Sequence, residues 1–263
     1  MKTLTKTLFT AALLAFAGQS FAKPTNGGSK DGSYVVTDRK PTAGFNGVNV
    51  GGPFDVSIVQ GPVESIKVSA PSEVMNMIVT EVNNGILKVS GKNDGRDWDS
   101  WCQMHKRIVV YVTVKDLKSI NVSGSGSAFF KDGLTLNSLK LNLSGSGNMI
   151  GNLNVKNLES DISGLGNIKL SGKAEMSTVR IASSGDFTAA NLITTKSDVH
   201  ISGSGDAEIN AREKVSAEVN GAGSVLYTGD AKIISGTKNG GGDIAKFNLS
   251  DMRQSLPLNI VSL

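Results

Sequence analysis

Four charged or polar side chains recur at a near-constant spacing in the second half of the chain. They are Asp161, Arg180, His200 and Glu218, separated by 18 to 20 residues. Polysaccharide lyases and hydrolases work with clusters of carboxylates, or with carboxylates beside a cation. A lyase or hydrolase site on this column is one hypothesis. The other is a solvated outer face, since the outward columns of repeat proteins carry mixed charges.

A polar segment that holds both tryptophans is the second candidate site. Residues 90–107 are rich in charge and include Arg96, Trp98 and Trp101. Aromatic side chains with a flanking arginine are typical contact residues at interfaces. One hypothesis is that this inserted loop binds a partner. The alternative is that one or both tryptophans fold back against the flank of the protein.

A third pattern consists of oxygen-bearing side chains that each follow a glycine. Oxygen ligands suit Ca²⁺, but the spacing near 19 residues differs from the nonapeptide calcium repeat, and serine and asparagine interrupt the acids. We expect instead a stacked polar column that accepts hydrogen bonds from turn amides, and no metal site. The residues are Ser127, Asn148, Asn167, Asp186, Asp206, Ser224 and Asp243.

Other common catalytic and cofactor motifs are absent from the sequence. The two histidines, His105 and His200, and the single cysteine, Cys102, have no zinc-type spacing. Gly124 and Gly126 lack the third glycine and the strand–helix context of a dinucleotide site. No Gly-x-Ser-x-Gly nucleophile motif occurs. We therefore expect no cofactor.

The candidate residues are positioned by a repeat whose corners are marked by glycine. Most corners read Ser/Asn-Gly-x-Gly, and a period of 18 to 21 residues is the signature of a solenoid. The leucine-rich repeat pattern does not hold, and propeller blades are about 40 residues long. We expect the corner glycines to supply φ > 0. The last glycines of the corners are Gly126, Gly147, Gly166, Gly185, Gly205, Gly223 and Gly242.

Apolar side chains form columns when the repeats are aligned on these glycines. Four residues before the last glycine stand aliphatic residues such as Leu143 and Ile162, and two residues after it stand Met149, Ile168 and their equivalents. Polar residues alternate with them, as the two-residue period of a strand requires. The pattern predicts an all-β protein, a single-stranded parallel β-solenoid (β-helix) that is right-handed, with coils of about 18–21 residues.

Composition and the first residues predict an exported protein. The formal charge is +4, of which Lys2 and Lys6 lie in a signal-like segment, and this balance is too mild for nucleic-acid binding. Residues 1–22 combine those lysines, an apolar core and a Ser-Phe-Ala cleavage pattern, as in a secretory signal peptide. No stretch reaches the ~20 apolar residues of a membrane helix. We expect a periplasmic, secreted or cell-surface location.

The remaining chain divides by composition. Residues 23–44 are expected to be a flexible N-terminal arm, residues 45–247 the solenoid with the loop 90–107 inserted, and residues 248–263 a C-terminal cap. The units before Phe129 are less regular than the later ones, which suits a capping half.

Four segments resemble the bacterial head GIN domain family, described as a putative autotransporter adhesin head. They are Phe45–Val50 (FNGVNV), Phe54–Gly61 (FDVSIVQG), Gly85–Val89 (GILKV) and Leu117–Gly126 (LKSINVSGSG). The resemblance extends over Phe45 to Phe247. It implies a β-solenoid with an adhesin-like surface role, and it supplies no catalytic residues.

The sequence thus leads to one main hypothesis and two alternatives. The main one is an exported, non-enzymatic solenoid that binds a cell-surface protein or polysaccharide along a flat face. Its expected binding residues are those of the column and of the tryptophan loop: Asp161, Arg180, His200, Glu218, Arg96, Trp98 and Trp101. The first alternative is a polysaccharide lyase or hydrolase that uses the charged column. The second is an envelope protein that self-associates, as a homo-oligomer, through a solenoid end or edge.

Overall fold

The computed structural model describes residues 33–92, Trp98 and residues 107–247. The signal peptide expected over residues 1–22 and the cap expected over 248–263 lie outside the described residues, as does most of the loop 90–107. No helix in the described ranges is long and apolar enough to cross a membrane. The elements are β1 (Tyr34–Arg39), β2 (Gly47–Val50), β3 (Asp55–Gln60), β4 (Ser65–Pro71), η1 (Met75–Met77), β5 (Ile78–Asn83), β6 (Ile86–Gly91), β7 (Val109–Val114), β8 (Ser119–Val122), β9 (Ala128–Leu143), β10 (Met149–Ile162), β11 (Ile168–Ile181), β12 (Phe187–Ile201), β13 (Ala207–Val219), β14 (Val225–Thr228), β15 (Lys232–Lys238) and β16 (Ile244–Lys246).

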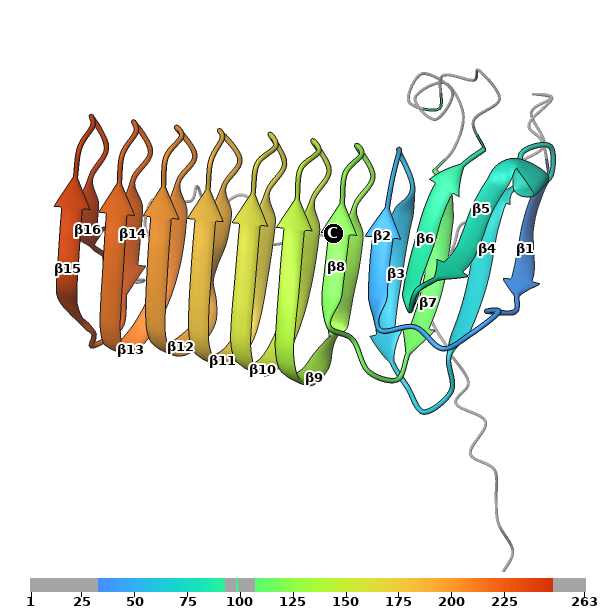
Figure 1. Ribbon diagram of the computed structural model, residues 1–263, viewed down its shortest axis with the longest axis horizontal. Helices are drawn as coiled ribbons and strands as arrows, with labels where there is room; N and C mark the ends of the chain where they lie inside the picture. The colour runs from blue at the N-terminus through green and yellow to red at the C-terminus, as the bar shows by residue number, and fades with distance from the viewer. Residues whose placement is uncertain (1–32, 93–97, 99–106, 248–263) are drawn as a thin grey trace, which may run out of the picture. The chain divides into compact units, whose positions relative to one another are not determined.

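Strands β9 to β13 stack in chain order as parallel rungs of a β-solenoid, which confirms the predicted fold class (Figure 1). The predicted period is also confirmed, because Met149 lies opposite Ile168 and Ile168 lies opposite Phe187. The rung after β13 is formed by β14 and β15, and β16 pairs in parallel with β14 as part of the next one.

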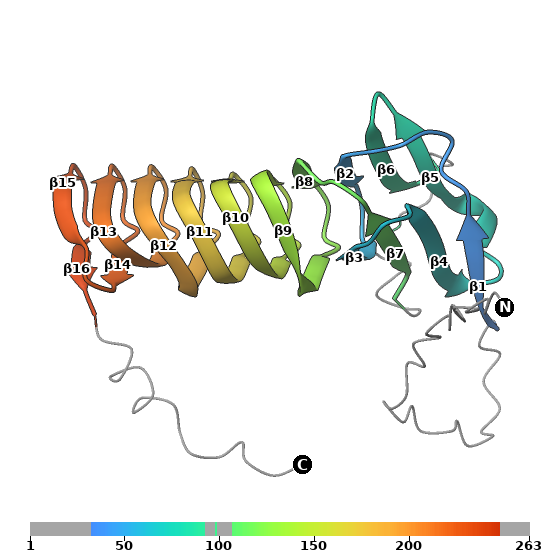
Figure 2. The ribbon, with the colours of Figure 1, turned by 90° about the horizontal axis from the view of Figure 1, so that it is seen from below.

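Each rung turns at two opposite edges, and the burial pattern shows where. In β10, buried and exposed residues alternate from Met149 to Val155, Lys156 and Asn157 are both exposed, and alternation resumes at Leu158. The strand therefore bends at Lys156–Asn157. The glycine corners lie along one edge of the stack, at the top of Figure 1, and the bends lie along the opposite edge, which Figure 2 shows from below.

The core consists of the aliphatic columns that the sequence alignment predicts. Leu143, Ile162 and Ile181 are neighbours in register and buried, and the same holds for Met149, Ile168 and Phe187. One rung alone could not bury these side chains, because each column is covered by the rungs on either side. Stacking is therefore what makes the individual rung stable.

The expected reason for the corner glycines is wrong. The described glycines with positive φ are Gly52, Gly85, Gly133, Gly172 and Gly229, and none of them is a last corner glycine. The corners instead need glycine because successive backbones approach too closely for a side chain. A Cβ added to Gly145 would lie 2.0 Å from the carbonyl oxygen of Gly124, and one added to Gly147 would lie 1.7 Å from that of Gly126.

The N-terminal part departs from the expected single-stranded parallel coil. Strand β1, which falls within the arm expected at 23–44, pairs antiparallel with β4, and β4 pairs antiparallel with β7. Strands β5 and β6 form an antiparallel hairpin. Parallel pairing begins with β7 beside β3 and with β6 beside β2. Alternation alone does not encode strand direction, so the sequence pattern could not distinguish these hairpins from coils.

Candidate functional site

The structure brings the four predicted column residues together on the outer face of β10 to β13. Asp161 lies opposite Arg180, Arg180 opposite His200, and His200 opposite Glu218. A second polar column lies two residues earlier on these strands and begins one strand before them, at Lys140 of β9. We call the two columns together the charged face; its members are Lys140, Glu159, Asp161, Arg180, Asp198, His200 and Glu218.

The charges at one end of the charged face neutralise one another. Arg180 Nη1 lies 2.8 Å from Glu159 Oε1 and 3.4 Å from Asp161 Oδ1. Lys140 Nζ contacts the same two carboxylates at 3.2 and 3.1 Å. The hydrogen bonds to Asp161 and then to Glu159 raise the pKa of Lys140. Both carboxylates are thus already occupied by cations of the chain itself.

The other end of the charged face is built around His200. Its Nε2 lies 3.1 Å from Asp198 Oδ2 and its Nδ1 lies 3.2 Å from Glu218 Oε2. Asn220 Nδ2 donates to Glu218 Oε1 at 2.8 Å, and this bond, followed by that from His200, lowers the pKa of Glu218. A general acid for glycoside cleavage needs a raised pKa, so Glu218 is poorly suited to that role.

Trp98 packs against the core and lies beside the solenoid. Its ring is half-buried and stands edge-on to Phe54, with 5.4 Å between ring centroids and 60° between planes. Its Nε1 donates to the carbonyl oxygen of Lys92 at 3.3 Å. The predicted partners Arg96 and Trp101 lie outside the described residues. The binding role of this segment therefore stays a prediction.

The polar residues after the corners form a continuous ladder, which we call the corner ladder. The amide of Asp186 donates to Asn167 Oδ1 at 2.9 Å, and the amide of Asp206 donates to Asp186 Oδ1 at 2.9 Å. The expected hydrogen bonding to turn amides is confirmed. In the described ranges, no three His, Cys, Asp or Glu side chains are grouped so as to hold a metal ion. The ladder runs through Asp55, Ser127, Asn148, Asn167, Asp186, Asp206, Ser224 and Asp243.

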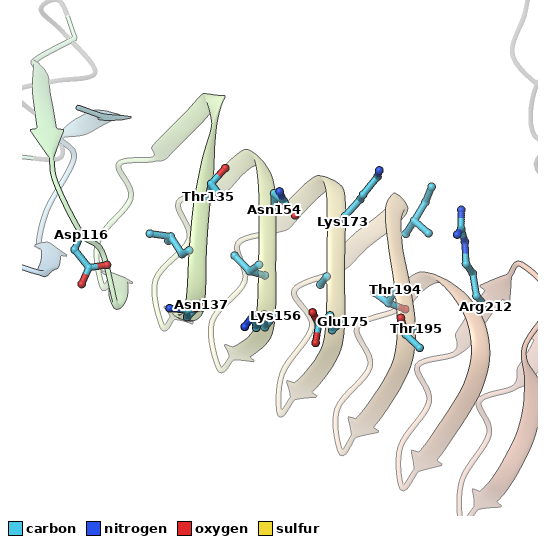
Figure 3. A pocket seen from close by; sticks show the side chains of 14 residues that line it. Asp116, Thr135, Asn137, Asn154, Lys156, Lys173, Glu175, Thr194, Thr195 and Arg212 are labelled. Atoms are coloured by element: carbon cyan, nitrogen blue, oxygen red, sulfur yellow. The ribbon is translucent and has the colours of Figure 1, made fainter. Parts of the chain in front are cut away.

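A groove at the bend edge is a site that the sequence reasoning missed. It has a volume of about 630 Å³ and crosses β9 to β12, and we call it the bend groove (Figure 3). Each rung contributes three successive residues, the last of which is the first residue of its bend. The middle residue forms the floor, and Figure 3 shows the outer two on opposite sides. The triplets are Thr135-Leu136-Asn137, Asn154-Val155-Lys156, Lys173-Ala174-Glu175 and Ile193-Thr194-Thr195, with Asp116 and Arg212 at the two ends.

The floor of the bend groove is closed, whereas its walls are open to ligands. Val155 and Ala174 are 4% and 6% exposed, so the floor belongs to the core. In the described part of the chain, Lys156, Lys173 and Arg212 make no ion pair and no side-chain hydrogen bond. The signal for this groove is present in the sequence as the break in alternation at each bend, where two polar residues stand together.

A second groove of about 650 Å³ lies on the other side of the bend. It is lined by Lys140, Glu159 and Arg180 of the charged face, together with Met176 and other residues. The two grooves have similar volumes, and each is lined by three cations and two carboxylates, but their cations differ in how they are paired. Lys140 and Arg180 of the second groove are paired with carboxylates of the chain, whereas Lys118 of that groove and the three cations of the bend groove make no ion pair among the described residues.

Comparison with solved structures supports the fold. The chain is similar to a putative adhesin from Bacteroides fragilis, with 26% identity and a TM-score of 0.75, over 83% of this chain and 98% of that one. A putative adhesin from Parabacteroides distasonis (24% identity, TM-score 0.66, 82% of this chain and 98% of that one) shares the fold. So does a structure from the same species titled a putative lipid binding protein (22%, TM-score 0.67, with 82% and 98% covered).

No functionally curated protein matches the chain. One family profile does, described as "Putative auto-transporter adhesin, head GIN domain", and it matches residues 44–231. That range covers strands β2 to β14, the charged face and the bend groove. The match confirms the resemblance seen in the four sequence segments, and the chain belongs to the head GIN domain family.

Proposed function

We propose that this protein is a non-enzymatic, adhesin-like binding protein that holds an extended partner along the side of its rungs. The observation that carries the proposal is the bend groove, which crosses four rungs and offers equivalent positions on each of them. A groove built by repetition suits a ligand that is itself long and repetitive. Family membership supports the same role, since its description is that of an adhesin.

Export fits this role. The signal-like segment at residues 1–22 and the adhesin description of the family both favour a protein that acts in the periplasm or on the cell surface. Fractionation of cells that express the full chain, followed by immunoblotting, tests the assignment. Retention of an uncleaved chain in the cytoplasm would contradict it.

Catalysis on the charged face is the competing function, and its chemistry is less favourable. Asp161 contacts both Lys140 and Arg180, and the pKa of Glu218 is lowered. Incubation of the purified protein with a polysaccharide panel should therefore release no reducing ends. Release that disappears in Asp161→Asn or Glu218→Gln would replace the binding proposal with an enzymatic one.

The binding proposal is tested by filling the bend groove without disturbing the core. Asn154 is exposed on the groove wall, so Asn154→Trp places a large side chain in the groove at little expense to stability. The matched control is Lys169→Trp, which lies on β11 outside the groove lining. A glycan array and a whole-cell binding assay should show loss of binding for the first variant alone. Equal binding by both variants would rule out the bend groove.

A further inference from the structure

All three cations of the bend groove make no ion pair among the described residues, whereas only Lys118 of the second groove's three cations is in that state. Lys156 and Lys173 stand on opposite walls of neighbouring rungs, and Arg212 closes the β12 end (Figure 3). A cation that lies in a groove without a partner in its own chain gains free energy when a ligand supplies an anion. Arg180 and Lys140 gain little, because Glu159 and Asp161 already bind them.

A column of lysines runs along the bend beside the groove, in register with Asn157 and Met176 of the second groove. Lys196 directly follows the groove residue Thr195, and it lies in register with Lys214 on β13 and Lys232 on β15. All three are exposed. Neighbouring strands are about 4.8 Å apart, so these like charges repel one another unless an anion lies alongside them. The acidic residues nearby are Asp116 and Glu175 in the groove, Glu213 beside Arg212, and Asp230 two residues before Lys232.

The other groups of the groove indicate the kind of anion. Thr135, Asn137, Asn154 and Thr195 present hydroxyls and amides at successive rungs, which can donate to and accept from sugar hydroxyls. The carboxylates of Asp116 and Glu175 can accept from the same hydroxyls. Among the residues that the structure describes, no aromatic side chain lines the groove for stacking of bases, and the buried floor offers acyl chains little apolar surface.

We propose that the bend groove and the adjoining lysine column bind a linear acidic polysaccharide. Its carboxylates contact Lys156, Lys173 and Arg212, and its hydroxyls contact the threonines and asparagines of the walls. The chain of sugars runs across the rungs, so that successive residues meet equivalent positions on successive strands. This inference rests on the proposed function and adds to it the chemical class of the ligand.

The test compares two forms of one polymer. Polygalacturonate and its fully methyl-esterified form share a backbone and differ in charge, and binding of each to the full-length protein is measured by isothermal titration calorimetry. We expect the acid to bind at least tenfold more tightly at low salt, and to lose most of that advantage at 1 M salt, where the Debye length falls to about 3 Å.

Charge-removing variants locate the site. The triple variant Lys156→Gln, Lys173→Gln, Arg212→Gln should weaken binding of polygalacturonate by about threefold to a hundredfold, because it removes three exposed ion pairs with the ligand. The matched control Lys88→Gln, Lys169→Gln, Lys246→Gln removes the same charge elsewhere and should bind like the parent. Circular dichroism spectra of both variants verify that they fold.

The outcomes separate this inference from the function on which it rests. Equal affinity for the acid and the ester, or equal effects of the two triple variants, would overturn the acidic ligand and leave an adhesin for neutral glycans. Tighter binding to duplex DNA or to anionic phospholipid vesicles than to polygalacturonate would overturn the polysaccharide. Absence of binding to every glycan and cell surface would overturn the proposed function itself.

Discussion

The two edges of each rung obey opposite rules. At the glycine corners a glycine returns as the last corner residue on every rung, and the corner ladder uses side-chain oxygens to bind the amides of the next rung. At the bends the residues change from Thr135 to Asn154 to Lys173, and their side chains remain open to solvent. The constant edge holds the rungs together, and the variable edge is where this protein can acquire binding specificity.

The largest effect on stability is expected at the corner edge. Gly145→Ala should lower the free energy of unfolding by about 3 kcal/mol, because the new Cβ would lie 2.0 Å from the carbonyl oxygen of Gly124. Gly241→Ala is the matched control, since a Cβ there meets nothing within 4 Å. Urea denaturation followed by circular dichroism measures both. If the two variants are equally stable, close backbone approach does not explain the corner glycines.

A smaller effect is expected in the corner ladder. Asp186→Ala leaves the amide of Asp206 without its acceptor and should lower the free energy of unfolding by about 1 kcal/mol. Asp186→Asn retains an acceptor oxygen, as Asn148 and Asn167 do at the same position. Thermal unfolding should therefore place Asp186→Asn close to the parent. A loss of the same size in both variants would assign the effect to the carboxylate charge.

A pH-dependent effect is expected on the charged face, between the two edges. The hydrogen bonds from Asn220 and His200 lower the pKa of Glu218, so they stabilise the folded state more when its carboxylate is ionised. This contribution is complete above the ordinary pKa of 4.5 and is lost as the pH falls through the lower value of the folded protein. The thermal stability of Glu218→Gln should therefore differ from that of the parent at pH 7 and become equal to it at acid pH. Thermal unfolding across this range measures the difference, and a constant gap would contradict it.

The smallest effect on stability is expected at the bend edge. Lys173 is exposed and makes no ion pair among the described residues, so Lys173→Gln should change the free energy of unfolding by less than about 0.5 kcal/mol. The same variant should weaken binding of polygalacturonate measurably. A large loss of stability here would remove the distinction between a structural edge and a binding edge.

The sequence predicted the features that depend on spacing. The interval between glycines set the length of the rung, and alternation placed Leu143, Ile162 and Met149 in the core. Spacing also predicted that Arg180 lies next to Asp161. It did not predict the ion pairs that Glu159 of the neighbouring column makes with Lys140 and Arg180. Those contacts depend on side-chain reach across strands, which a count of residues does not contain.

Strand direction and the position of the groove were not predicted, for physical reasons. Antiparallel and parallel strands show the same two-residue alternation, so the pairing of β1 with β4 was invisible in residues 34–39 and 65–71. The bend groove depends on a bend within the strand, which in β11 lies where Glu175 and Met176 are both exposed. One pair of neighbouring exposed residues does not reveal a bend in the sequence. The bend edge is identified only because such pairs recur on successive rungs.

Because each parallel rung contacts only its two neighbours, the number of rungs sets how far the bend groove can reach. Removal of one whole repeat, residues 168–186, would leave Met149 facing Phe187 and would shorten the stack by one strand spacing of about 4.8 Å. Duplication of the same segment would lengthen it equally. Gain or loss of single repeats in the gene therefore changes the length of the bend groove in steps of one strand spacing and leaves the fold itself unchanged.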